Sequence, residues 1–285
     1  MLAQKQCLKC LKNLVKMTIE LSFLQSKISA KINQDIKISL LKELNLQFCL
    51  KKVPAEVFTK INRKIKKLSG IEDAFAQRKQ QELNSAKIIS TKLLENNSLS
   101  LEELVLLSAK GNSLDFFKTI QESEKDMKKK ISFALNHFDL FAKKLKKSKN
   151  IVFFADNAGE WFFDQPLISF LTLTNKVYYV VKSSSIQNDL TIVDLKNLTD
   201  NLNFANNIIP SGNDAVGIEL STITPALSSK IKQADIIIAK GMGYYETFTE
   251  LPEYKTKVFH LLMAKCAPVA KSLGVSLNSY VFTQS

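Results

Sequence analysis

The sequence has no apolar run long enough to cross a membrane. Apolar runs such as IVFFA (151–155) and VYYVV (177–181) have five residues each, whereas a membrane-spanning helix needs about 20. The first residues, MLAQKQCLKC, lack the apolar core and cleavage site of a signal peptide. We therefore expect a cytoplasmic protein that does not bind a membrane.

Cysteine and histidine are scarce, with four and two residues among 285. Four thiols in a cytosolic chain do not make a disulfide scaffold. The motif CLKC (7–10) has the spacing of two zinc ligands, but a closed zinc site needs four ligands and there is no second such pair. The alternative is that Cys7 and Cys10 share one face of the first helix. Of the two histidines, His260 lies inside a buried-looking strand and is expected to belong to the core.

Motifs of three common enzyme classes are also missing. The absence of GxxxxGK[ST] excludes a P-loop nucleotidase, and the lack of GxGxxG after the first predicted strand argues against a dinucleotide site. The absence of GxSxG argues against an α/β-hydrolase. The composition, 45% apolar and 24% charged, is that of an ordinary globular protein with one large or two ordinary domains.

Positive charge is confined to the first half of the chain. Residues 1–150 contain 30 Lys and Arg against 15 Asp and Glu, whereas residues 151–285 contain 10 against 12. The basic residues are spread through predicted helices with few aromatic residues between them, so no surface for stacking nucleotide bases is prepared. We expect only weak, salt-dependent contact with nucleic acid and no specific recognition.

The first half, residues 1–149, is predicted to form a helical domain of five or six helices. Val57, Ile61, Ile65 and Leu68 recur at helical spacing. The segment 127–145 shows the same period, and no strand-like alternation appears before residue 148. A domain boundary is therefore expected between residues 149 and 150.

The second half, residues 150–285, is predicted to form a Rossmann-like α/β domain. Short runs rich in β-branched and aromatic residues are typical of strands buried on both faces. Helical stretches between them predict a parallel sheet with right-handed crossovers. The predicted strands are 151–155, 177–182, 206–210, 235–239, 258–263 and 275–282, and the predicted helices are 160–174, 190–203, 225–233 and 266–273.

Polar residues follow each of the first four predicted strands, where ligands bind in parallel sheets. Turns favour Asn, Asp and Gly in any case, but four such loops at one sheet edge are harder to explain by turns alone. Carboxylate and amide oxygens suit Mg²⁺ or Mn²⁺, and a lysine beside glycines suits a phosphate. Together they form a set for phosphoryl transfer. The residues are Asp156, Asn157 and Glu160; Asn188 and Asp189; Asn213 and Asp214; and Lys240 with Gly241.

The order of these loop motifs resembles a known family over nearly the whole chain. The motifs are the N-terminal CxxC, KGNSLDF (110–116), DNAGE (156–160), NDLT (188–191), SGNDAVG (211–217), KGMGYYE (240–246) and LLMAKC (261–266). The sequence is similar to the metal-dependent damage-control phosphatases of domain of unknown function 89, prokaryotic type. The resemblance implies an N-terminal helical domain on a Rossmann-like α/β domain. It also implies hydrolysis of a small phosphorylated metabolite.

The resemblance further implies the roles of individual residues. A divalent metal (Mg, Mn, Co or Ni) would be bound by Asp156, Asn157 and Asp189. Catalysis would involve Asp156, Asp189, Lys240 and Glu160, with Lys240 near the substrate phosphate. Residues in or near the substrate pocket would be Asn112, Asp115, Asn188, Asp214, Lys240 and Gly241.

The sequence departs from the family at four positions. Lys182 and Ser185 stand where the family has arginine and proline, Val216 replaces a proline, and Tyr244 replaces an asparagine. The three metal positions and Lys240 are intact. We therefore expect metal binding and hydrolysis to be retained and substrate preference to have changed.

Simpler interpretations of the same residues remain open. Asp156 and Asn157 could be helix N-caps, and Glu160 could stabilise a first helical turn. Lys240 could be a solvated loop lysine, and Asn112 with Asp115 could mark a helix start. At the level of function, the alternatives are a non-catalytic protein that binds metal and a phosphorylated ligand and, less favoured, an S-adenosylmethionine-dependent carboxyl methyltransferase. The sequence indicates neither the substrate nor an oligomeric state.

Overall fold

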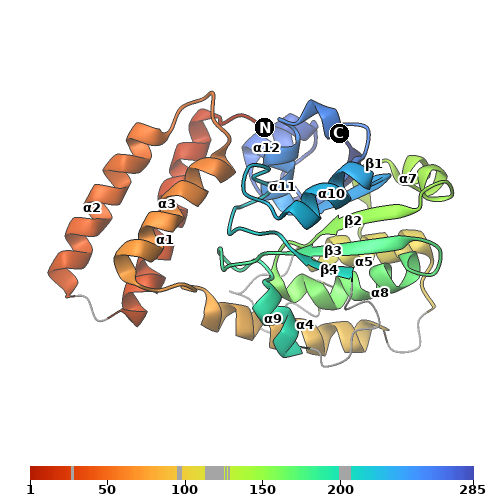
Figure 1. The fold of residues 1–285 in the computed structure, drawn as a ribbon, viewed down its shortest axis with the longest axis horizontal. Helices are drawn as coiled ribbons and strands as arrows, with labels where there is room; N and C mark the ends of the chain where they lie inside the picture. Colours follow the sequence, from red (N-terminus) through yellow and green to blue (C-terminus); the bar gives the residue numbers. More distant parts are fainter. Residues whose placement is uncertain (27–28, 95–97, 113–124, 126, 128, 199–206) are drawn as a thin grey trace.

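A seven-stranded sheet forms the centre of the computed structural model (Figure 1). The structure describes residues 1–285 except 27–28, 95–97, 113–124, 126, 128 and 199–206. The strands are β1 (Phe133–Asn136), β2 (Asn150–Phe154), β3 (Lys176–Val181), β4 (Ile208–Pro210), β5 (Ile236–Lys240), β6 (Val258–Met263) and β7 (Tyr280–Gln284). Their order across the sheet is β1-β7-β6-β5-β2-β3-β4. Strands β2 to β6 are parallel, whereas β7 runs antiparallel to β6 and pairs in parallel with β1.

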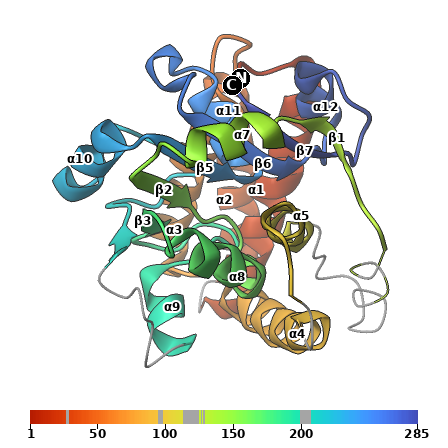
Figure 2. The same ribbon diagram turned by 90° about the vertical axis from the view of Figure 1, so that its right-hand side faces the viewer.

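Helices cover both faces of this sheet, so its central strands are apolar on both sides. In β2, Ile151 and Phe153 pack into one core, and Val152 and Phe154 pack into the other. Figure 2 shows α8 on one side of the sheet and α11 on the other. The first core receives α5 (Leu101–Gly111), α7 (Phe138–Leu145), α8 (Trp161–Leu171) and α9 (Ile192–Leu198). The opposite face carries α10 (Pro225–Gln233), α11 (Gly241–Phe248) and α12 (Ala267–Leu273). This arrangement confirms the predicted α/β fold class.

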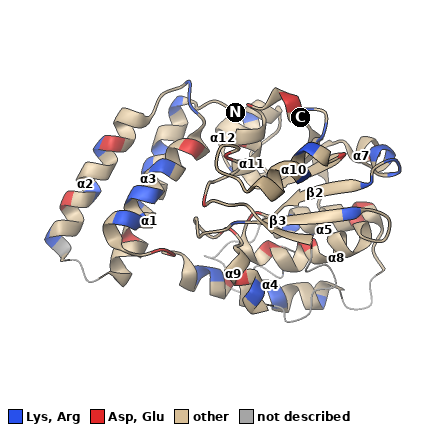
Figure 3. Cartoon of the chain, in the orientation of Figure 1, with Lys and Arg blue, Asp and Glu red and all other residues tan. Residues whose placement is uncertain are grey.

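Three N-terminal helices form a layer beside the sheet (Figure 1). They are α1 (Lys5–Gln25), α2 (Ala30–Gln47) and α3 (Pro54–Ser69). Val57, Ile61 and Ile65 are buried as their spacing predicts, whereas Leu68 is 45% exposed. Ile186, from the loop after β3, packs into the same apolar cluster. The helical layer therefore packs against a loop that was predicted to carry site residues. Figure 3 shows basic residues along α1 and α3.

The prediction of a helical first half, residues 1–149, is wrong at strand β1. The segment 127–145, predicted to be one helix, contains β1 and then α7. Phe133 and Leu135 alternate with more exposed residues and pair with β7, so the period there is two and becomes helical only from Phe138. The predicted boundary at 149/150 therefore separates β1 from the sheet to which it belongs, and α7 from the core against which it packs.

The remaining sequence predictions of secondary structure agree with the structure in part. The strand predicted at 275–282 is observed at Tyr280–Gln284, and the helix predicted at 190–203 is observed as α9, with residues 199–203 outside the described residues. Each predicted strand overlaps an observed one, and the helices predicted at 160–174, 225–233 and 266–273 correspond to α8, α10 and α12. Cys7 is buried and Cys10 is exposed, both on α1. None of the helices that the structure describes is both long and apolar enough to span a membrane.

Candidate functional site

The four predicted polar loops lie at one edge of the sheet. They follow β2, β3, β4 and β5, which are parallel, so all four leave the carboxyl ends of their strands. Two backbone hydrogen bonds join the first two loops, from Leu190 N to Asp156 O (2.8 Å) and from Ala158 N to Asn188 O (2.8 Å). Asn157 and Asp189 face each other in an antiparallel bridge between these bonds. The residues implied as metal ligands are therefore adjacent.

Two side-chain amides hold the half-buried Asp156 carboxyl group in place. Its Oδ2 atom accepts hydrogen bonds from Asn112 Nδ2 (2.9 Å) and Asn157 Nδ2 (3.2 Å). Burial raises the pKa of Asp156 well above its usual value, and the nearby charges of Glu160 and Asp189 raise it further. The carboxylates of Asp156, Glu160 and Asp189 repel one another because little water screens their charges. This repulsion favours binding of a proton or a cation between them.

The amide of Asn157 is fixed with its nitrogen turned inward. Nδ2 donates to Glu160 Oε1 at 2.6 Å as well as to Asp156. Within the described part of the chain, no donor contacts Asn157 Oδ1 or Asp156 Oδ1. No three His, Cys, Asp or Glu side chains of the described residues converge as a metal site. The candidate set consists instead of two carboxylates and one amide, all oxygen donors of the kind that hard cations prefer.

Asp189 completes this oxygen set and has a buried lysine beside it. Asp189 is 3% exposed, and its Oδ2 atom lies 3.7 Å from Lys182 Nζ. Burial raises the pKa of Asp189 to about 6, although the charge of Lys182 opposes this shift. Lys182 in turn donates to three neutral oxygens: Ala215 O (2.7 Å), Gly217 O (2.8 Å) and Tyr244 Oη (3.0 Å).

Lys240 lies beneath the site and has no exposed surface. Its ammonium group donates to Ser108 O (2.9 Å), pairs with Glu160 Oε2 (2.6 Å) and contacts Asp164 Oδ1. These three partners use all its donors. The predicted contact of Lys240 with a phosphate is therefore not supported by this arrangement. Lys240 acts on Glu160 instead: burial raises the pKa of Glu160, but Lys240, together with Lys265 and the Asn112 amide, lowers it below its usual value.

The other predicted pocket residues divide into two groups. Asn112 belongs to the site, because Nδ2 also donates to Glu160 Oε1 (2.7 Å) while Oδ1 accepts from Met263 N (3.2 Å). Asp214 turns towards α3 instead and pairs with Arg63 (2.7 Å) and Lys66 (3.1 Å). Asp115 lies outside the described residues.

Gly241 touches the site through its backbone. Its φ is +78°, a region that favours glycine. A Cβ atom at this position would lie 2.0 Å from Asp156 Oδ2. Only a residue without a side chain fits between the end of β5 and Asp156.

Sequence reasoning missed three charged residues of this region, namely Glu82, Asp164 and Lys265. Glu82 belongs to α4 (Ala76–Leu94), and its carboxylate accepts from Asn188 Nδ2 at 3.1 Å. Asp164 lies one turn after Glu160 on α8, a spacing that could have indicated a second buried acid. Lys265 follows β6, a fifth parallel strand, and is exposed. Its positive charge lowers the pKa values of Asp156 and Glu160, although burial is the larger influence on both.

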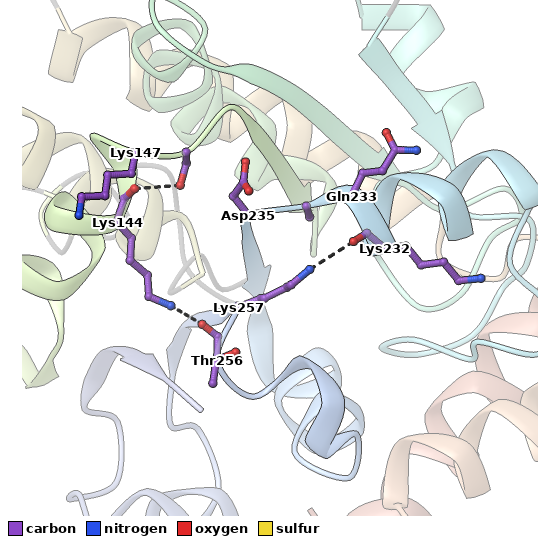
Figure 4. Close-up of a pocket in the computed structure, with 9 residues that line it drawn as sticks. Lys144, Lys147, Lys232, Gln233, Asp235, Thr256 and Lys257 are labelled. Atoms are coloured by element: carbon purple, nitrogen blue, oxygen red, sulfur yellow. Dashed lines mark hydrogen bonds between the residues drawn. The ribbon is translucent and has the colours of Figure 1, made fainter.

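A separate hollow of about 530 Å³ lies at the opposite edge of the sheet (Figure 4). It is formed where the chain enters β2, β5 and β6, and four of its lining residues are lysines. Lys257 donates to Lys232 O (3.2 Å), and Lys144 donates to Thr256 O. Asp235 accepts from the backbone N–H groups of Lys149 and Asn150. The residues that line this hollow do not include Asp156, Asn157 or Asp189.

Comparison with known proteins places this geometry in a family. Residues 3–281 match the model of the damage-control phosphatase ARMT1-like domain. The chain belongs to this family. A damage-control phosphatase of Pyrococcus horikoshii is 29% identical over 99% of this chain and 97% of its own length. Another from Archaeoglobus fulgidus is 29% identical over 89% of this chain and 88% of its own length. An uncharacterized protein of Methanocaldococcus jannaschii is 33% identical, over 80% and 79% respectively.

The fold agrees with a solved structure of the same family. The crystal structure of a DUF89 family protein from Pyrococcus horikoshii superposes with a TM-score of 0.88 at 28% identity, covering 100% of this chain and 99% of that one. The family relationship supports a phosphatase role for the chain.

Two positions at which the sequence departs from the family pattern, Lys182 and Tyr244, contact each other directly. The lysine ammonium also lies 4.4 Å from the centre of the tyrosine ring.

Proposed function

We propose that the protein is a metal-dependent phosphatase that hydrolyses a small phosphorylated metabolite. The observation that carries the proposal is the pair of carboxyl groups, half-buried Asp156 and buried Asp189, on adjacent loops at the carboxyl edge of the sheet. Both have raised pKa values because of burial, and neighbouring carboxylates contribute to the shift. A divalent cation would relieve the repulsion between these charges.

The donor set fits a hard divalent cation such as Mg²⁺, Mn²⁺, Co²⁺ or Ni²⁺. Asp156, Asn157 and Asp189 would hold it through oxygen atoms, since the Asn157 nitrogen is committed to Glu160 and Asp156. Such a cation supplies Lewis-acid polarisation of a phosphoryl oxygen and a lower pKa for water.

The chain's own residues would prepare the site and offset charge. Lys240 keeps Glu160 ionised, and Glu160 fixes the amides of Asn112 and Asn157 in one orientation. Among the described residues, Lys265 is an exposed lysine at the same edge and would offset the charge of a bound phosphate. Lys240 therefore acts through Glu160, and Lys265 takes the role first expected of Lys240.

The test is release of inorganic phosphate from a panel of sugar phosphates, nucleotides and phosphopantetheine-type compounds with each of the four metals. Asp189→Asn should reduce both metal affinity and turnover, because it removes a charge next to the cation. Metal binding without hydrolysis across the whole panel would contradict the proposal and favour a non-catalytic binding protein.

A further inference from the structure

Helix α4 carries two buried ionisable side chains that face the loop bearing Asp189. Lys79 and Glu82 are one turn apart and are 2% and 7% exposed. Burying an ionisable group is costly unless it is paired or hydrogen-bonded. Their partners therefore indicate which parts of the molecule they hold in place.

Lys79 interacts with both ends of the segment 185–194, directly with Asp194 and through Asp73 with Ser185. Its ammonium group pairs with Asp73 (2.5 Å) and with Asp194 (2.9 Å). Asp73 also accepts a hydrogen bond from Ser185 Oγ (2.9 Å), at the start of the segment. Asp194, at its end, accepts from the backbone N–H of Thr191 (3.0 Å) and from its hydroxyl group (2.7 Å). The segment is thus held at two points by one lysine.

Glu82 contacts the middle of the same segment and the neighbouring loop. It accepts from Asn188 Nδ2 (3.1 Å), directly before Asp189, and from the backbone N–H of Gly159. A Cβ atom on Gly159 would lie 2.5 Å from Glu82 Cγ, so the Glu82 side chain lies directly against the backbone of Gly159. Glu82 therefore joins the two loops that carry Asp156, Asn157 and Asp189.

We propose that Lys79 and Glu82 are positioning residues that hold the Asp189-bearing segment in register with the Asp156–Asn157 loop. Their contacts form a latch, defined here as Lys79 with Asp73 and Asp194 and Glu82 with Asn188 and Gly159. The proposal rests on the metal site of the proposed function. It assigns the geometry of that site in part to a helix of the N-terminal half.

The latch should set metal affinity, because residues that hold metal ligands in place commonly change that affinity about 10- to 100-fold when removed. The variants are Lys79→Met and Glu82→Leu. Lys87→Met is the matched control, because Lys87 is an exposed lysine on the same helix. Lys79→Arg and Glu82→Gln keep the hydrogen-bonding groups and should restore most of the loss. If the first pair fails to fold, Ser185→Ala, which removes only the hydrogen bond from Ser185 to Asp73, serves as the test variant and should still speed exchange in residues 185–194.

Two measurements avoid dependence on catalysis. Hydrogen exchange of the metal-free protein should show faster exchange in residues 185–194 for Lys79→Met and Glu82→Leu, with Lys87→Met unchanged. Titration with Mn²⁺ alone, followed by electron paramagnetic resonance, should show affinity weakened about 10- to 100-fold in the same two variants.

Unchanged exchange in 185–194 and unchanged Mn²⁺ affinity in both folded variants would overturn the latch. Uniformly faster exchange over the whole chain would also overturn it, because that result indicates general destabilisation. Lack of phosphate release by the native protein would count against the proposed function but leaves both latch measurements valid.

Discussion

Substituting alanine for Gly241 should displace Asp156 and weaken metal binding at least about tenfold while the fold persists. Two effects act at this position. The first is backbone strain, since φ is +78° and an L-residue in the left-handed region costs about 1–2 kcal/mol. The second is a collision, because the new Cβ atom would lie 2.0 Å from Asp156 Oδ2 and 2.4 Å from its Cγ.

The chain contains controls that separate these effects. Gly70 and Gly274 have φ values of +71° and +68°, and no atom lies within 4 Å of a Cβ built at either position. Gly70→Ala and Gly274→Ala therefore carry the strain without the collision. Each should lose about 1–2 kcal/mol of stability, or roughly 2–8 °C in Tm.

The assay compares Tm and Mn²⁺ affinity for the three variants. Gly241→Ala should lose at least about tenfold in affinity, because Asp156 must move or rotate and cannot keep its hydrogen bonds to Asn112 and Asn157. Gly70→Ala and Gly274→Ala should bind Mn²⁺ like the native protein. If Gly241→Ala bound Mn²⁺ normally, Asp156 would not be a metal ligand in the position described.

Three further predictions concern charge. Glu82→Gln should remove part of the pH dependence of stability, because burial raises the pKa of Glu82 from its usual 4.5 to about 8. The native carboxyl then holds a proton that the unfolded chain releases, and the contribution of Glu82 to stability falls as pH rises from 4.5 to 8. In denaturant unfolding, the native protein should lose about 4 kcal/mol more stability than the variant between pH 5 and pH 9, and an equal loss in both would refute this. Lys240→Met should lose about 3–5 kcal/mol in denaturant unfolding, because Glu160 and Asp164 stay buried without their cation; a change below 1 kcal/mol would contradict this. Lys265→Met should raise KM for phosphate esters with Tm unchanged, and an unaltered KM would refute its contact with phosphate.

Much of the α/β half could be predicted because its local signals agree with its tertiary structure. Runs such as 151–155 and 235–239 are apolar on both faces, and only strands buried in a parallel sheet need this pattern. Because ligands bind at the carboxyl ends of parallel strands, the sequence also predicts that Asp156, Asn157 and Asp189 lie together. Strand β1 was missed because its partner, β7, lies more than 140 residues later in the chain, and its four residues carry little period of their own.

The errors at the site have a different origin. Lys240 follows a strand like the other site residues, but its direction depends on Glu160 and Asp164, which lie on another element. Whether a lysine faces a ligand or a buried acid is a property of its tertiary partners. Glu82 and Lys79 were missed for the same reason, since nothing near them in sequence distinguishes them from other charged residues of an amphipathic helix.

The uneven charge of the two halves acquires a structural explanation from these contacts. The excess of basic residues before residue 150 was expected to give only weak contact with nucleic acid, and several of these residues pair with acids of the other half. Arg63 bonds Asp214 and Glu219, and Lys79 bonds Asp194 at the end of the segment that carries Asp189. Such pairs favour one docking of the helical half on the loops of the sheet, because a shifted position would leave buried or half-buried charges unpaired. Charge in the first half therefore serves in part to position the helices over the site to which they contribute Asn112 and Glu82.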